Sequence, residues 1–181
     1  MCFASIKLML EVELEKTYLA KKIPEGLFDC NFKEIMDIYV PADYVHPVLR
    51  IRKKGEKYEI TKKTPIVEGD SSEQNEHTIS LTKEEFESLS KVKGKKVRKY
   101  RYYYNHKGVQ AEFDIFKDKL EGLALVDFEF KEVADKNNFA MPDFCLADVT
   151  NEEALAGGML CGKKYSDILP TLRKYKYKKL K

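Results

Sequence analysis

The stretch Glu11-Val12-Glu13-Leu14-Glu15 decides how the chain can fold, because charged and apolar residues alternate along it. Successive side chains of a β-strand point to opposite faces, so the three glutamates share one face at a spacing of roughly 7 Å. The alternation recurs with the opposite charge in Arg50-Ile51-Arg52. Like charges side by side weaken a sheet, so we expect these faces to hold something of opposite charge, such as metal ions or phosphates.

Period-two alternation continues through most of the chain and predicts about eight strands. The segments are 6–20, 32–40, 48–54, 57–63, 73–81, 95–104, 109–116 and 123–133. Glycines at two reversal points, Gly55 and Gly108, predict hairpins and an antiparallel meander. A capping box of Thr82 and Glu85 predicts a helix over 81–92 that crosses between strands, and further helices are expected over 151–157 and from Tyr165 to the end.

Length and composition favour a single domain spanning 1–181. Lys and Arg total 33 against 30 Asp and Glu, a balance that argues against a dedicated nucleic-acid binder. Four scattered cysteines predict reduced thiols and a cytoplasmic location, and no apolar run approaches the roughly 20 residues that span a bilayer. The polar segment 64–72 is expected to be a mobile loop, and the basic tail 173–179 a frayed terminus.

The charges are separated by strand when each strand is sorted by parity. Acids gather on the first and last strands and bases on the middle ones: Glu11, Glu13, Glu15, Asp127 and Glu129 against Arg50, Arg52, Lys63, Lys99 and Arg101, with Asp114 in the strand that follows the bases. This separation is expected if the sheet closes and brings its first and last strands together. An ordinary solvated face would show mixed signs along each strand, and spacing alone leaves both interpretations open.

The chemistry of the two sets indicates what a closed sheet would hold. Carboxylates without accompanying His or Cys suit Mg²⁺ or Mn²⁺, and several Arg and Lys suit a polyanion. Together they describe a phosphoryl-transfer site.

Seven short motifs, in order along the chain, resemble those of the triphosphate tunnel metalloenzymes, the CYTH superfamily named for class IV adenylyl cyclase and thiamine triphosphatase. They are Glu13-Leu14-Glu15-Lys16-Thr17, Leu49-Arg50-Ile51-Arg52, Ile60-Thr61-Lys62-Lys63, Lys99-Tyr100-Arg101-Tyr102, Phe113-Asp114-Ile115-Phe116, Asp127-Phe128-Glu129-Phe130 and Asp148-Val149-Thr150. Each motif is weak alone, but the ordered set covers about 11–150 and is specific.

The resemblance implies an α+β fold, a closed eight-stranded antiparallel β-barrel with a few helices packed outside, whose tunnel binds a triphosphate and Mg²⁺ or Mn²⁺. It implies metal ligands at Glu13, Glu15, Asp114, Asp127 and Glu129, phosphate contacts at Arg50, Arg52, Lys63, Lys99 and Arg101, and catalytic roles for Lys99 and Tyr39. Glu76 is similar to a further acidic tunnel position. The chain departs from the pattern at Thr17, which replaces the signature lysine, at Gln74, which replaces an arginine, and at Asp127, which shortens a glutamate.

These residues predict hydrolysis of the terminal phosphoanhydride of inorganic triphosphate or a related organic triphosphate. A class IV-type adenylyl cyclase, a catalytically weak module that binds polyphosphate or nucleotides, and assembly as a homodimer all stay open. The segment 157–164 nearly matches a P-loop, but we reject that interpretation. Lys164 replaces the final hydroxyl residue of the motif, and a helix is expected where a P-loop needs a strand. The glycines of this segment are expected to end that helix. The aromatic run 102–104 is assigned to packing.

Overall fold

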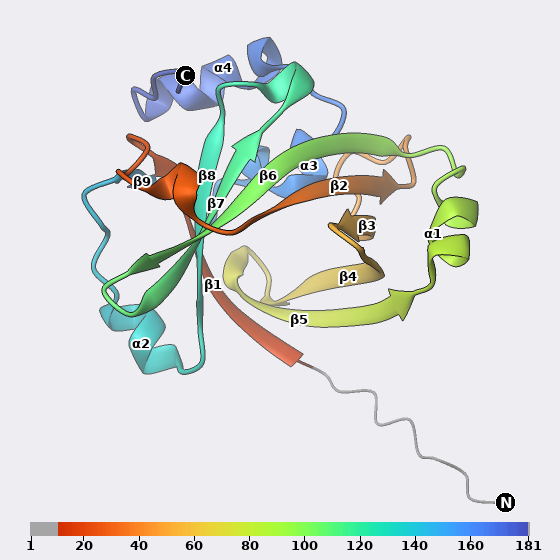
Figure 1. Ribbon diagram of the computed structural model, residues 1–181, viewed down its shortest axis with the longest axis horizontal. Helices are drawn as coiled ribbons and strands as arrows, with labels where there is room; N and C mark the ends of the chain where they lie inside the picture. The colour runs from red at the N-terminus through yellow and green to blue at the C-terminus, as the bar shows by residue number, and fades with distance from the viewer. Residues whose placement is uncertain (1–10, 181) are drawn as a thin grey trace, which may run out of the picture.

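A computed structural model describes residues 11–180, in which nine strands form one curved sheet (Figure 1). The strands are β1 Glu11–Ala20, β2 Phe32–Val40, β3 Leu49–Lys54, β4 Lys57–Val67, β5 Asp70–Leu81, β6 Lys95–His106, β7 Val109–Phe116, β8 Ala124–Phe130 and β9 Cys145–Asp148. The helices are α1 Lys83–Leu89, α2 Val133–Asn138, α3 Gly157–Leu160 and α4 Tyr165–Lys174, with 3₁₀ turns η1 Leu27–Asp29, η2 Asp118–Leu120 and η3 Glu153–Leu155.

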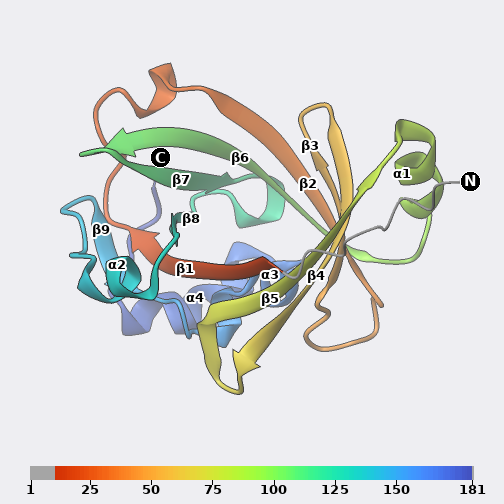
Figure 2. The same cartoon turned by 90° about the horizontal axis from the view of Figure 1, so that it is seen from below.

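Eight of these strands close into a barrel because β1 pairs on both sides. Leu14 lies opposite Glu73 of β5, and Glu15 lies opposite Glu129 of β8, so the ring runs β1-β5-β4-β3-β2-β6-β7-β8 and returns to β1. All pairings are antiparallel, and β9 adds to β1 beside the ring through Tyr18 and Asp148. The view from below shows the curved wall of strands (Figure 2). The predicted α+β fold with a closed eight-stranded antiparallel barrel is therefore confirmed.

The predicted meander is only partly right. Strands β2 to β5 form one meander and β6 to β8 another, and the two meanders join where β2 pairs with β6. Strand β1 does not pair with β2, the next strand along the chain, but with β5, β8 and β9. Helix α1 connects β5 to β6, which are not neighbours in the ring. The capping box that begins α1 forms as predicted, since Thr82 Oγ1 accepts from Glu85 N and Glu85 Oε2 accepts from Thr82 N.

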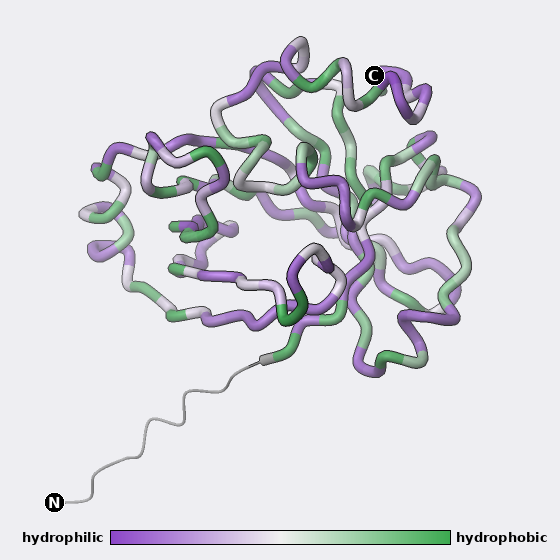
Figure 3. The backbone as a smooth tube through the Cα atoms, turned by 180° about the vertical axis from the view of Figure 1, so that it is seen from behind, coloured by the Kyte–Doolittle hydropathy of each residue, from purple (hydrophilic) through white to green (hydrophobic). Residues whose placement is uncertain are grey.

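Apolar residues form three core clusters, two on the outward faces of the strands and one that joins Tyr39 of the cavity lining to Leu172 of α4. The tube alternates between hydrophobic and hydrophilic residues along the strands (Figure 3). Phe86 of α1 packs on Ile38 and Ile51. Val126 and Phe128 of β8 pack among aromatic residues on the outside of the barrel. Strand parity therefore sends the residues between them, such as Asp127, toward the interior.

The segment 64–72 is not a mobile loop, so that prediction is wrong. Strand β4 continues to Val67 and β5 begins at Asp70, and the reversal between them uses Gly69 at a φ of 84°, which glycine adopts without strain. The predicted helix over 151–157 is instead the 3₁₀ turn η3 followed by α3. Gly157 begins α3 rather than ending a helix.

The C-terminal tail is ordered against the barrel through Leu180, which corrects the expectation of a frayed terminus. The Tyr177 hydroxyl donates to Gly122 O at 3.0 Å and accepts from Ala124 N at 2.8 Å, and Leu180 N donates to Gly122 O. The part of the predicted first strand that precedes Glu11 lies outside the described residues. Within 11–180, no helix combines the length and apolar character needed to traverse a bilayer.

Candidate active site

The interior of the barrel holds a cavity of about 400 Å³. All eleven residues predicted for the site line it: Glu13, Glu15, Tyr39, Arg50, Arg52, Lys63, Lys99, Arg101, Asp114, Asp127 and Glu129. They come from seven of the eight ring strands and meet because each occupies an inward-facing position of its strand. The interpretation as a solvated outer face is excluded, since Glu13 and Arg50 point into one shared cavity.

Acidic side chains outnumber basic ones in this lining. Eleven Asp and Glu stand against six Lys and Arg, an excess of five negative charges if all are ionised. Burial, reinforced by Glu112 and Glu13, raises the pKa of Glu129 to about 7. Burial, reinforced by Glu15 and Asp114, also raises the pKa of Asp127 well above its usual range. Acids therefore outnumber bases in the cavity, and Glu129 and Asp127 hold protons more readily than ordinary carboxylates, which relieves part of the repulsion.

A dense ion-pair network joins Lys99 and Arg101 to Asp114. Lys99 Nζ donates to Asp114 Oδ2, and Arg101 holds both Asp114 oxygens through Nε at 2.7 Å and Nη2 at 2.6 Å. Arg101 also reaches Asp127 Oδ2 at 2.9 Å and donates to Glu112. Burial would raise the pKa of Asp114, but Arg101 and Lys99 outweigh it and hold that pKa far below its usual range. Asp114 is therefore a fully ionised carboxylate that two cations already share.

Asp37 is a residue of the cavity lining that the sequence prediction missed. It accepts two hydrogen bonds from Arg52, Nε to Oδ1 at 2.6 Å and Nη2 to Oδ2 at 2.9 Å, and both side chains are buried. Burial would raise the pKa of Asp37, but the opposing effect of Arg52 is larger and lowers that pKa to about 2. Asp37 shares the strand parity of Tyr39, a signal that could have placed it in the interior. Its position fixes the Arg52 guanidinium toward the cavity.

Arg50 has no such partner. Its Nε is buried and donates to no hydrogen-bond acceptor within 11–180, and no ion pair involving Arg50 occurs among those residues. A buried donor without an acceptor costs about 1–3 kcal/mol, so a ligand acceptor at this point would be favoured. Arg50 lies on β3 between Tyr39 of β2 and Thr61 of β4. The cavity therefore contains a preformed, unsatisfied anion contact.

The carboxylates of β1 are held by Lys63 and Thr17. Lys63 Nζ donates to Glu13 and lies 3.6 Å from Glu15 and 3.3 Å from Glu76. Thr17, at the position of the signature lysine, places Oγ1 3.1 Å from Glu15 Oε1 and 2.9 Å from Asp127 Oδ1. A hydroxyl supplies one proton and no charge, so the substitution leaves these acids without a cation at that point.

The residues fit a divalent metal unequally. Glu13, Glu15, Asp127 and Glu129 are hard oxygen donors on adjoining strands, and burial together with neighbouring acids raises the pKa of Asp127 and Glu129, an effect that a bound cation would offset. Asp114 fits less well, because Lys99 and Arg101 already saturate its oxygens. In their present rotamers, the carboxylates of the described chain nowhere converge in threes around one point. Metal binding at β1 and β8 would therefore require small side-chain movements.

The segment that follows β9 lines the cavity with Val149 to Gly158. A Cβ on Gly157 would lie 2.3 Å from the Tyr39 hydroxyl, and one on Gly158 would lie 2.2 Å from Pro47 O, so only glycine permits this close packing. Because η3 rather than a strand precedes these glycines, the segment lacks the strand that a P-loop requires.

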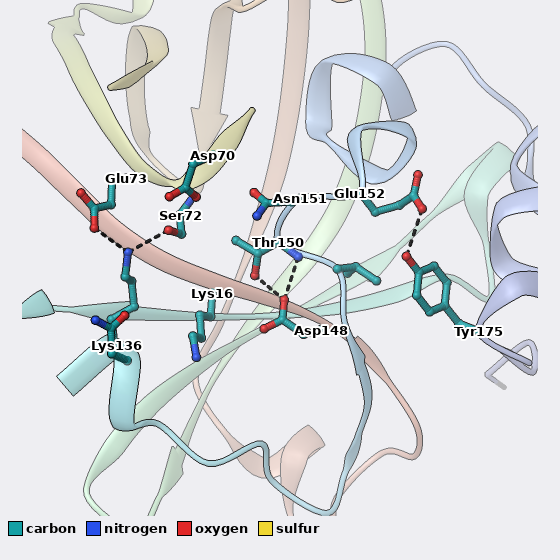
Figure 4. Close-up of a pocket in the computed structure, with 12 residues that line it drawn as sticks. Lys16, Asp70, Ser72, Glu73, Lys136, Asp148, Thr150, Asn151, Glu152 and Tyr175 are labelled. Atoms are coloured by element: carbon teal, nitrogen blue, oxygen red, sulfur yellow. Dashed lines mark hydrogen bonds and ion pairs between the residues drawn. The ribbon is translucent and has the colours of Figure 1, made fainter. Parts of the chain in front are cut away.

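A second, open pocket of about 620 Å³ lies outside the barrel, beside β1 (Figure 4). Lys136 crosses one side of it and donates to Ser72 Oγ and Glu73 Oε1, both at 2.7 Å. Thr150 lines both this pocket and the barrel cavity, and its Oγ1 accepts a hydrogen bond from Thr17 N at 3.1 Å. None of the eleven predicted residues lines this larger pocket, so the smaller barrel cavity is the candidate site.

A closed antiparallel barrel whose interior carries ordered rows of carboxylates and cations defines a charged β-tunnel protein. The CYTH domain family model matches residues 9–139, and the chain belongs to that family. No curated protein sequence matches it significantly.

Solved structures support the fold. The hypothetical protein NE1496 is 26% identical, with a TM-score of 0.61 over 84% of this chain and 99% of that one. A structure described as the inorganic triphosphatase NE1496 is 24% identical, with the same TM-score over 86% and 97%. A putative adenylate cyclase from Bacillus halodurans is 18% identical, with a TM-score of 0.51 over 70% and 84%.

Proposed function

We propose that this protein hydrolyses the terminal phosphoanhydride of inorganic triphosphate, or of a related organic triphosphate, with Mg²⁺ or Mn²⁺ as cofactor. The observation that carries the proposal is the buried Nε of Arg50, which has no hydrogen-bond acceptor within 11–180, in a barrel cavity that has an excess of carboxylates. A buried guanidinium donor without an acceptor favours an anion, and the excess of carboxylates favours cations. A metal-bound polyphosphate supplies both.

Charge complementarity restricts the substrate class. A triphosphate alone would add negative charge to a lining that already carries five more acids than bases. Bound Mg²⁺ or Mn²⁺ would neutralise phosphate oxygens and lower the pKa of water. In this proposal Arg50 and Arg52 would bind the phosphates, and the hydrogen bonds from Arg52 to Asp37 support this by fixing the orientation of the Arg52 guanidinium. Arg101, committed to three carboxylates, would chiefly hold the carboxylate wall in place.

Lys99 and Tyr39 are the proposed catalytic groups. Burial lowers the pKa of Lys99, with Arg101 adding to the effect and Asp114 opposing it, so this amine exchanges a proton more readily than an exposed lysine. Burial raises the pKa of Tyr39, which keeps its hydroxyl protonated and able to donate a hydrogen bond. We infer that the Lys99 ammonium donates its proton to the oxygen of the departing pyrophosphate as the terminal phosphoanhydride breaks, and that Tyr39 orients the phosphate chain.

The similarity to a protein described as an inorganic triphosphatase supports hydrolysis over cyclisation. The neutral Thr17 between Glu15 and Asp127 favours the alternative of a catalytically weak polyphosphate-binding module. Hydrolysis, cyclisation and simple binding all predict that a triphosphate occupies the same cavity, and they differ only in whether products form and in which products those are.

The test incubates the protein with tripolyphosphate, ATP and thiamine triphosphate, each with Mg²⁺ or Mn²⁺, and measures phosphate, pyrophosphate and cyclic AMP. Metal-dependent phosphate release that is lost in Glu13→Gln and Glu15→Gln supports the hydrolase. Lys21→Gln, on an exposed residue just after β1, is the matched control and should retain activity. Binding without turnover contradicts the proposal and favours the module, whereas pyrophosphate with cyclic AMP favours the cyclase.

A further inference from the structure

Lys63 is held by carboxylates rather than directed at an open anion site. Its ammonium donates to Glu13 and lies 3.6 Å from Glu15, both on β1 across the β1–β5 seam, and 3.3 Å from Glu76, which lies directly opposite Lys63 on the neighbouring β5. About 23% of its side chain is exposed, so the group is enclosed but in contact with the cavity. The Lys63 ammonium thus contacts three carboxylates at the point where β1 pairs with β5.

We propose that Lys63 is a positioning residue that holds the place of a metal ion: its ammonium keeps Glu13 and Glu15 together until a divalent metal displaces it, and the freed ammonium then binds phosphate. This inference rests on the metal site of the proposed function and adds an order of events to it. It assigns Lys63 two successive partners.

The distances exclude simultaneous occupation of the same oxygens. A divalent ion bound to Glu13 and Glu15 lies 2.0–2.6 Å from their oxygens. The ammonium already hydrogen-bonds to one of these oxygens and lies 3.6 Å from the other carboxylate, so ion and ammonium would sit within about 4 Å of each other. At that separation two positive charges repel each other, and the double charge of a divalent ion doubles the repulsion of a unit pair. The ammonium must leave for the metal to enter.

The released ammonium has a destination. Thr61 and Lys63 are two residues apart on β4 and both face the cavity, and Thr61 lies opposite Arg50 of β3. Arg50 is the guanidinium with a buried, unpartnered Nε. The lysine stem has four rotatable carbons, so its ammonium can swing from the carboxylates toward an anion bound at Arg50. Metal binding would therefore increase phosphate affinity, and by linkage phosphate would increase metal affinity.

The test measures Mn²⁺ binding by electron paramagnetic resonance, without phosphate, in the wild type, Lys63→Met and Lys62→Met. Lys62 is the exposed neighbour on the same strand and serves as the matched control. Lys63→Met should bind Mn²⁺ at least about tenfold more tightly than the wild type, because no cation competes for the glutamates. Lys62→Met should match the wild type. Equal or weaker Mn²⁺ binding by a folded Lys63→Met protein overturns the inference.

A second measurement does not depend on the variant folding. In the wild type, the ¹⁵N resonance of Lys63 Nζ should shift when Mg²⁺ is added, and a methylene-bridged tripolyphosphate analogue should shift it again. A resonance that Mg²⁺ leaves unchanged while Mg²⁺ binds overturns the proposed exchange. Failure of all metal binding overturns it together with the metal site. Metal binding with displacement of Lys63 but without phosphate release contradicts only the proposed reaction.

Discussion

Replacing Asp37 with asparagine isolates the contribution of the buried Asp37–Arg52 pair to stability. The side chains are 2% and 7% exposed, and the variant leaves the Arg52 guanidinium buried, its next acidic neighbour being Glu59 at 3.9 Å. The fall of the Asp37 pKa from 3.8 to about 2 corresponds to about 2 kcal/mol. Removing one partner of a buried pair costs about 3–5 kcal/mol in general. We therefore expect Asp37→Asn to lower the free energy of unfolding by about 2–4 kcal/mol at pH 7.

The pH dependence follows from the direction of this shift. Because the pKa of Asp37 is lower in the folded state than in the unfolded state, the stabilisation is present above about pH 4 and is lost as the pH falls toward 2. About half of the 2 kcal/mol should be gone by pH 3. The difference between wild type and Asp37→Asn should shrink over the same interval.

Urea unfolding at pH 7, 4 and 3, followed by circular dichroism, measures both effects. Asp43→Asn is the control, because Asp43 is 87% exposed in its contact with Lys93 and should change stability by less than about 0.5 kcal/mol. An Asp37→Asn protein as stable as the wild type at pH 7, or a difference that stays constant down to pH 3, would refute the reasoning.

Three further changes test other parts of the site. Thr17→Lys places a cation between Glu15 and Asp127 and should tighten tripolyphosphate binding at low metal concentration about tenfold, measured by calorimetry; unchanged or weaker binding contradicts the charge argument. Gly157→Ala puts a methyl group against the Tyr39 hydroxyl and should cost about 1–3 kcal/mol of stability together with turnover, measured by urea unfolding and phosphate release. Tyr177→Phe removes two hydrogen bonds near Gly122 and should cost about 1–2 kcal/mol, with turnover retained.

Alternation made the strands and the candidate site predictable from sequence. A period of two assigns each residue to one face, so placing the strands also placed the eleven site residues on a common interior. Asp37 escaped because a single acid between Met36 and Ile38 belongs to no row of charges. Its importance depends on Arg52, which is fifteen residues away along the chain and opposite it only in the sheet.

The remaining misses have similar causes. Strand β9 has four residues without alternation, and it exists because the edge of β1 offers it partners. The segment 64–72 is rich in polar and turn-forming residues, but its hairpin is held by Asn151, whose side chain accepts from Ser71 N at 2.8 Å. Tertiary contacts thus decided each of these segments.

The pairing of β1 with β5, β8 and β9 sets the order in which the protein can be assembled. This strand is synthesised before all three of its partners, the last of which ends at Asp148. On the ribosome, β2 to β5 can form hairpins as they emerge, whereas β1 has to wait for more than a hundred further residues before the ring shuts. Such distant pairing slows folding, so completion of the tunnel should be a late event in folding.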